Sequence, residues 1–199
     1  MAMSHYFSER QDGLERKERT LSYEHGSRVF TFTTDRGVFA RNEVDFATRL
    51  LIETIEIGQE VERMLDLGTG YGVIGVVLGA FHDLEVTMTD VNERALALAE
   101  RNLETNGVEA EVLKSDGFSA LQGEHFDLIV TNPPIRIGKE KLFPILEKAR
   151  DHLSEDGTLW LVCHKKQGAK TMRRHLERTY IVETKERKKG FHIFVCRPR

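Results

Sequence analysis

Strand-like and helix-like segments alternate along this chain from residue 63 onward, and this alternation restricts the fold more than any other feature. The pattern predicts strands at 64–67, 84–89, 110–114, 126–131 and 158–163, and helices at 72–81, 93–105, 139–153 and 169–177. Repeated strand–helix units of this kind predict an α/β protein whose mainly parallel sheet is covered by helices on both faces. Ligands of such sheets bind at the carboxyl ends of the strands.

The end of the chain departs from this alternation. Two further strands are predicted at 180–185 and 191–196, and only a turn at Lys188-Lys189-Gly190 separates them. Strands joined by so short a turn run antiparallel. We therefore expect a seven-stranded sheet whose last strand is antiparallel.

Before residue 63 the sequence predicts a β-hairpin and one helix. Runs 20–23 and 28–33 flank Glu24-His25-Gly26-Ser27, and the second run is rich in β-branched and aromatic residues. A helix is expected to open at Arg41 or Asn42, because apolar residues recur at helical spacing after it. We assign residues 1–40 to an N-terminal arm and hairpin, and residues 41–199 to the main domain. Together they have the size of a single compact domain.

Composition indicates a soluble globular protein, with 40% hydrophobic and 31% charged residues. No apolar run approaches the roughly 20 residues needed to cross a bilayer. The polar segment 1–13 lacks the apolar core of a signal peptide, so we expect a cytoplasmic monomer with no membrane partner. Cys163 and Cys196 fall in predicted strands without metal-ligand spacing, so we expect reduced buried thiols and no metal.

The net charge of −3 is unevenly distributed along the chain. Residues 164–199 contain six Lys and six Arg against three Glu, a net +9, so the preceding residues carry a net −12. A basic end on an acidic body suits a polyanionic partner such as RNA. The alternative is an ordinary solvated surface on the last helix and hairpin.

A glycine-rich turn, Leu65-Asp66-Leu67-Gly68-Thr69-Gly70-Tyr71-Gly72, joins the first strand of the alternating region to its helix. Gly68, Gly70 and Gly72 let the backbone turn tightly and approach a ligand without interference from Cβ atoms. We therefore interpret the turn, Thr69 included, as the binding site of a nucleotide-like cofactor.

The cofactor itself has two candidate identities. Gly70-Tyr71-Gly72-Val73-Ile74-Gly75 fits the dinucleotide fingerprint, and Asp90 follows 20 residues after Gly70. Asp66, just before the glycines, argues against a dinucleotide because its carboxylate would repel a pyrophosphate. The same carboxylate suits the ammonium group of S-adenosylmethionine, directly or through water, and we favour that cofactor.

Two further acidic residues follow the next strands. Asp90-Val91 is placed to accept hydrogen bonds from the ribose hydroxyls, with Asn92 the better cap for the following helix. Asp116, beside Gly117, is placed to bond the adenine amine, although an Asp-Gly turn is the plain alternative. Phe118 either covers the adenine or belongs to the core.

The tripeptide Asn132-Pro133-Pro134 closes the predicted strand 126–131. The Asn132 side-chain oxygen and the Pro133 carbonyl can accept the two hydrogens of a planar amine, while the prolines stiffen the loop. An amine held in this way is aimed at an electrophilic methyl group and stabilised as charge develops. The tripeptide therefore indicates methyl transfer to nitrogen, and a simple strand terminator is the alternative.

This motif resembles that of the class I S-adenosylmethionine-dependent N-methyltransferases, in which Phe or Tyr usually follows the prolines and Ile135 stands here. Gly37-Val38-Phe39-Ala40, followed by Asp45, is similar to a segment of the small-subunit methyltransferase group of bacterial ribosomal RNA guanine-N2 methyltransferases. The similarity covers 29–195 and looks like a short, single-domain branch. It implies a Rossmann-like fold with S-adenosylmethionine as cofactor.

The leading hypothesis is thus methylation of a guanine N2 amine in ribosomal RNA, or in a ribosomal subunit. Adenine N6 and a protein glutamine amide present similar amines, and a non-catalytic RNA-binding factor on the same fold is a further alternative. Candidate contacts to the substrate are Phe39, Ile135, Arg136 and Lys139.

Overall fold

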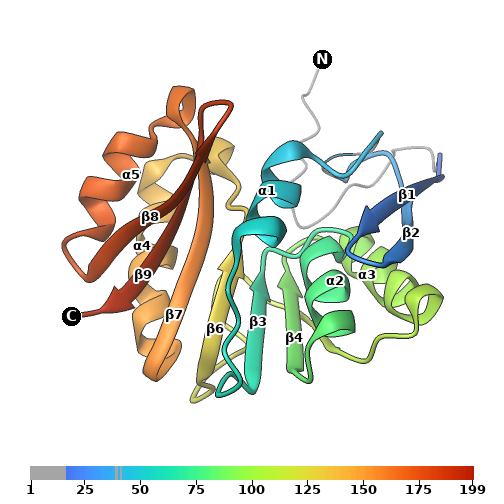
Figure 1. The fold of residues 1–199 in the computed structure, drawn as a ribbon, viewed down its shortest axis with the longest axis horizontal. Helices are drawn as coiled ribbons and strands as arrows, with labels where there is room; N and C mark the ends of the chain where they lie inside the picture. Colours follow the sequence, from blue (N-terminus) through green and yellow to red (C-terminus); the bar gives the residue numbers. More distant parts are fainter. Residues whose placement is uncertain (1–16, 39, 41) are drawn as a thin grey trace.

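The computed structural model describes residues 17–38, 40 and 42–199 (Figure 1). Seven strands form the main sheet in the order β5-β4-β3-β6-β7-β9-β8. The strands are β3 (Arg63–Leu67), β4 (Glu85–Asp90), β5 (Glu111–Lys114), β6 (Phe126–Thr131), β7 (Leu153–His164), β8 (Tyr180–Lys188) and β9 (Phe191–Pro198). β9 runs antiparallel to both of its neighbours, and the other pairings are parallel. The predicted sheet, with its antiparallel last strand, is confirmed.

Helices cover both faces of this sheet (Figure 1). They are α1 (Phe46–Thr54), α2 (Val73–Phe81), α3 (Glu93–Asn106), α4 (Lys139–Lys148) and α5 (Ala169–Leu176). Alternate strand residues point to opposite faces. Met64 packs with α1, α2 and α3 in one apolar cluster, whereas its neighbour Leu65 packs with α4 and α5 in another. The sheet is therefore buried on both sides, as its continuous apolar strands predict.

The predicted N-terminal hairpin is also present, as β1 (Arg19–His25) paired antiparallel with β2 (Arg28–Thr34). Two buried asparagines of α3 bond its backbone: Asn102 bonds Thr33, and Asn106 bonds Thr31. Phe30 and Phe32 are fully buried in the same cluster as α2 and α3. The hairpin thus packs against the main domain.

Three predicted boundaries were wrong. α1 begins at Phe46 rather than near Asn42, because the Asp45 side chain accepts hydrogen bonds from the amides of Ala47 and Thr48 and caps the helix there. The helix expected over 139–153 ends at Lys148 and continues as a 3₁₀ turn, η2 (Ala149–His152). β7 then starts at Leu153, five residues before the prediction, with a register shift opposite Phe126 and Leu128.

Within the described residues, no helix is long and apolar enough to cross a membrane. Cys163 and Cys196 are buried free thiols in β7 and β9, as predicted.

Candidate functional site

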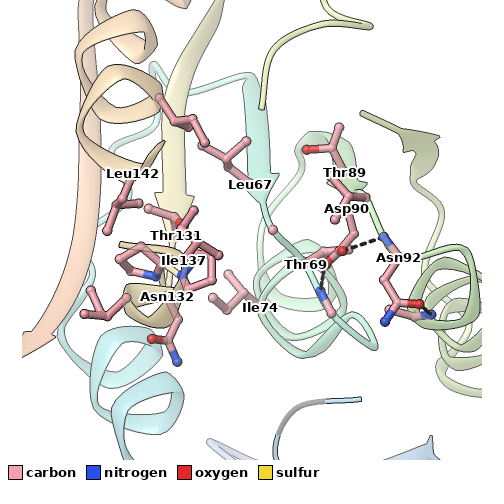
Figure 2. Close-up of a pocket in the computed structure, with 18 of the residues that line it drawn as sticks. Leu67, Thr69, Ile74, Thr89, Asp90, Asn92, Thr131, Asn132, Ile137 and Leu142 are labelled. Carbon is pink, nitrogen blue, oxygen red and sulfur yellow. Dashed lines mark hydrogen bonds between the residues drawn. The ribbon is translucent and has the colours of Figure 1, made fainter. Parts of the chain in front are cut away.

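A cavity of about 1130 Å³ lies at the carboxyl ends of β3, β4 and β6 (Figure 2). Figure 2 shows Thr69, Asp90 and Asn92 on one side of it and Asn132 and Ile137 on the other. The predicted site residues that line the cavity are Gly68, Thr69, Gly70, Asp90, Val91, Asp116, Gly117, Asn132, Pro133, Pro134, Ile135 and Arg136. Segments that are far apart in sequence therefore meet around one space.

The glycine turn presents its backbone to the cavity. The amides of Gly68 and Thr69 donate to the Thr89 carbonyl at 2.8 and 2.9 Å, which ties the turn to β4. Gly70 has a φ of +58°, and a Cβ added there would meet no atom within 4 Å. Gly72 has a different role: it does not line the cavity, and an added Cβ would lie 3.0 Å from the Met88 Cε atom.

Asp66 lies behind this turn instead of in the cavity, and it is completely buried. Its Oδ2 atom accepts hydrogen bonds from the Thr69 hydroxyl at 2.6 Å and the Gly75 amide at 2.9 Å. Its Oδ1 atom has no hydrogen-bond partner among the described residues. Burial raises the pKa of this carboxyl to about 6, against the opposing effect of the two hydrogen bonds. Asp66 therefore holds the turn, and its contact with a cofactor stays a prediction.

Asp90 lies at the end of β4 with both oxygens oriented by backbone amides (Figure 2). Oδ2 accepts from the Gly70 amide and Oδ1 from the Asn92 amide, each at 2.9 Å. Burial raises the pKa of this carboxyl, and these amides act in the opposite direction. Asn92 caps α3 by accepting from the amides of Arg94 and Ala95, so Asp90 is not needed as the cap. Each Asp90 oxygen keeps lone-pair capacity for a ligand hydroxyl.

The segment after β5 divides between the cavity and the core. Asp116 and Gly117 line the cavity. Phe118 does not, since it is 2% exposed and stacks on the His152 ring at a centroid distance of 4.4 Å. Of the two roles that the sequence left open for Phe118, the structure therefore gives the core role.

The Asn132 side chain is held in one orientation by α1. Its Nδ2 atom lies 2.9 Å from the Thr48 hydroxyl oxygen and 3.4 Å from an Asp45 carboxylate oxygen. The Thr48 hydroxyl donates its only hydrogen to Asp45, so it can only accept from Asn132. The amide nitrogen must then face α1, and no hydrogen bond from the described residues occupies the Oδ1 atom of Asn132, a residue that lines the cavity.

The prolines lead directly into a 3₁₀ turn, η1 (Ile135–Ile137). The Pro133 carbonyl already accepts a hydrogen bond from the Ile135 amide at 2.8 Å. A carbonyl oxygen has two lone pairs, so one remains for an amine hydrogen. Both acceptors predicted from the sequence can therefore still bind an amine, although one lone pair of the Pro133 carbonyl is already occupied.

The cavity has further walls that the sequence did not indicate. They include Thr48 of α1, Lys141 of α4, Gln167 of the 3₁₀ turn η3 (Lys165–Gln167) and Phe191 of β9. Of the predicted substrate residues, Ile135 and Arg136 line the cavity, whereas Lys139 does not. Phe39 lies outside the described residues.

Comparison with known protein families gives one match over most of the chain. The family described as "Methyltransferase small domain" matches residues 29–195. A Bacillus subtilis protein named "uncharacterized protein YbxB" is 42% identical over 193 residues, 95% of this chain and 96% of that protein. Ribosomal RNA small subunit methyltransferase C of Pasteurella multocida is 40% identical over 134 residues, 64% of this chain and 40% of that protein.

Among solved structures, the T. thermophilus 16S rRNA N2 G1207 methyltransferase in complex with AdoMet and guanosine superimposes with a TM-score of 0.82. It is 27% identical, and the match covers 92% of this chain and 51% of that chain. A ribosomal protein L11 methylase from Lactobacillus delbrueckii matches with a TM-score of 0.64 over 76% of this chain and 77% of its own, and at 23% identity it shares the fold alone. This chain spans about half the length, or less, of the ribosomal RNA methyltransferases that it matches.

Proposed function

Because this chain belongs to the methyltransferase small domain family and is an S-adenosylmethionine-dependent N-methyltransferase, we propose that its acceptor is the exocyclic N2 amine of a guanine in ribosomal RNA. The observation that carries the proposal is the fixed orientation of Asn132. Asn132 lines the same cavity as the glycine turn, and no described residue bonds its Oδ1 atom, so an amine acceptor and a cofactor can meet there.

The residues around the glycine turn fit the cofactor. The open space beside Gly68 and Gly70, where no atom lies within 4 Å of an added Cβ, lets a ligand approach the backbone. Asp90 and Asp116 line the same cavity, and we assign Asp90 to the ribose hydroxyls and Asp116 to the adenine amine. The Oδ1 atom of Asp66, which no described residue bonds, suits the cofactor's ammonium group through a bridging water. When bound, the cofactor supplies a methyl sulfonium, which is a strong electrophile.

The acceptor side needs orientation more than base strength. Asn132 accepts one hydrogen of the amine through Oδ1, and Pro133 accepts the other through the remaining lone pair of its carbonyl. Both acceptors stabilise the positive charge that develops on the nitrogen as it gains the methyl group. The methyl group would leave the sulfonium as a neutral thioether, and the nitrogen would then pass one hydrogen to water as a proton. Because the cationic nitrogen is acidic, no strongly basic side chain is required.

Three observations support guanine in RNA over other amines. Two of the matched proteins bear on it: the Pasteurella relative is named as a ribosomal RNA methyltransferase, and the T. thermophilus enzyme is an N2 methyltransferase solved with guanosine. The cavity volume of about 1130 Å³ accommodates both a cofactor and a base. The net +9 charge of residues 164–199 suits a polyanion.

The test is transfer of a tritiated methyl group from S-adenosylmethionine to extract of cells that lack this protein. RNA and protein fractions are counted separately, and the labelled RNA is digested to nucleosides. The proposal expects label in RNA, recovered as N2-methylguanosine. Label confined to protein would contradict the proposal and move the activity to amide methylation.

A further inference from the structure

The end of the β8–β9 hairpin lies beside the cavity. Phe191, the first residue of β9, pairs with His164, the last residue of β7. The Lys165 amide donates to the Gly190 carbonyl at 2.8 Å, which joins η3 to the hairpin turn. Phe191 and Gln167 line the cavity from this side. The hairpin turn and η3 thus form one surface at the cavity edge.

Four lysines project from this surface, and we call them the basic tip: Lys165, Lys166, Lys188 and Lys189. All four are exposed, and no acidic side chain of the described residues pairs with them. Other cations of the same C-terminal region are paired, since Lys185 bridges Glu56 and Glu183. The basic tip is the part of this region nearest the cavity. Its four positive charges therefore have no acidic partner among the described residues.

Cations around the hairpin turn, of which only Lys165 belongs to the tip, also act on a neighbouring histidine. Burial lowers the pKa of His192, and the charges of Arg187, His164, Lys165 and Arg173 lower it further. Lys189 is held in place by its ammonium group, 4.8 Å from the centroid of the Phe46 ring. The tip therefore carries several positive charges close together, and the side chain of Lys189 is restrained by its contact with Phe46.

An aromatic ring marks the inner edge of the tip. Phe191 is half-buried and lies 5.5 Å from Phe46, centroid to centroid. Phe46 follows Asp45, which helps to orient Asn132. The Phe191 ring therefore lies against α1, the helix that also orients Asn132. Ile135, which follows the two prolines, supplies only an aliphatic contact to a base.

We infer that the basic tip and Phe191 form the docking surface for the RNA strand that carries the target base, with the lysines on its phosphates and Phe191 stacked against the extruded base. This inference rests on the proposed function, because it names how the RNA reaches the same site. A base within a duplex cannot reach Asn132 inside the cavity, so it must leave the stack. Its flanking phosphates then lie at the cavity edge, where the lysines are. Single-stranded RNA is held by this combination of cationic groove and stacking ring.

The first experiment compares two charge-matched variants. The tip variant carries Lys166→Gln and Lys188→Gln, and the control carries Lys148→Gln and Arg178→Gln, which are exposed cations at the ends of α4 and α5 away from the cavity. Binding of a fluorescent single-stranded RNA is measured by anisotropy at several salt concentrations. We expect the tip variant to bind about 20-fold more weakly at 0.1 M salt and to lose about 1.4 from the salt slope. The control is expected to bind nearly as the wild type does.

The second experiment separates stacking from charge. Phe191→Leu keeps an apolar side chain, and Phe143→Leu is its control because Phe143 is also half-buried but lies outside the cavity. We expect Phe191→Leu to lower kcat/KM for RNA methylation by about tenfold, with the salt slope unchanged. The Phe143→Leu variant is expected to keep kcat/KM, and both should bind S-adenosylmethionine as the wild type does.

The outcomes distinguish this inference from the function on which it rests. Absence of methyl transfer to RNA by the wild type would contradict the proposed function. Methyl transfer by the wild type with equal salt slopes for the tip and control variants would overturn the docking surface alone. Equal binding of polyglutamate and RNA, with no effect of Phe191→Leu on methyl transfer, would also overturn it, because the tip would then be a general polyanion site.

Discussion

The two walls of the cavity are built in different ways. The cofactor wall consists of short loops that follow β3, β4 and β5, and backbone amides of Gly70 and Asn92 fix the Asp90 carboxylate. The acceptor wall is assembled from distant segments, in which Asn132 is held by Thr48 of α1 and faces a space that Phe191 also lines. Loop backbone makes the first wall, and tertiary contacts between side chains make the second.

This difference predicts a division of labour between the walls. A wall of backbone with a carboxylate held by backbone amides is suited to hold one ligand in one position. A wall whose reactive group depends on a neighbouring helix governs how well an acceptor is aimed. Substitutions in the first wall should therefore change cofactor affinity, whereas substitutions in the second should change the rate of transfer.

Asn132→Ala is expected to have the largest effect. It removes the acceptor of one amine hydrogen, so kcat for methyl transfer should fall by about 100-fold or more. The cofactor dissociation constant, measured by calorimetry on the same preparation, should stay within a few-fold of the wild-type value. A matching loss of cofactor affinity would break the division between the walls.

Asp90→Ala tests the opposite wall. It removes the acceptor of the Gly70 amide and the proposed partner of the ribose, so the cofactor dissociation constant should rise by roughly 30-fold. At saturating cofactor, the single-turnover rate should recover most of its wild-type value. A rate that stays low at saturation would assign Asp90 to the transfer step instead.

Thr48→Val tests how α1 holds Asn132 in the acceptor wall. Valine cannot accept from the Asn132 amide, so the side chain is free to turn and kcat should fall by about tenfold, with the cofactor affinity unchanged. Thr48→Ser keeps the hydroxyl and is expected to restore kcat. If the valine and serine variants had equal activity, Thr48 would have no positioning role.

The smallest expected effect is the pH dependence that Asp66 gives to the free energy of unfolding. Its folded pKa is raised from 3.8 to about 6, so the folded state binds the proton more tightly, and stability falls as pH rises through this window. Asp66→Asn removes the titration. The free energy of unfolding of the wild type should therefore fall, relative to that of the variant, by about 1 kcal/mol between pH 5 and pH 7. Urea unfolding at both pH values measures it, and a difference independent of pH would contradict the burial argument.

The cofactor wall was the more predictable of the two from sequence. Gly70 and Asp90 were identified because turns and strand ends are encoded by adjacent residues. Asp66 and Phe118 show the limit of that reasoning: their positions in sequence were informative, but the direction of each side chain depends on packing, and both are buried away from the cavity. Local sequence thus predicts the secondary-structure element of a residue better than it predicts the direction of its side chain.

The acceptor wall and the β7 boundary depend on contacts that no local pattern records. Thr48 reaches Asn132 across 84 positions of sequence, so no motif joins them. In sequence, Phe191 has the pattern of an ordinary strand residue. It reaches the cavity because β9 pairs with β7. The early start of β7 follows from the pairing of Leu153 with Phe126, although turn-forming residues come after it.

Asn132 is proposed to direct a methyl group to guanine N2, and the identity of the methylated nucleoside tests this role. Small-subunit ribosomal RNA from cells that lack this protein is incubated with S-adenosylmethionine carrying a trideuterated methyl group, and the digested nucleosides are analysed by mass spectrometry. We predict deuterated N2-methylguanosine with the wild type and almost none with Asn132→Ala. Deuterium in N6-methyladenosine, or equal N2-methylguanosine from both proteins, would contradict the account.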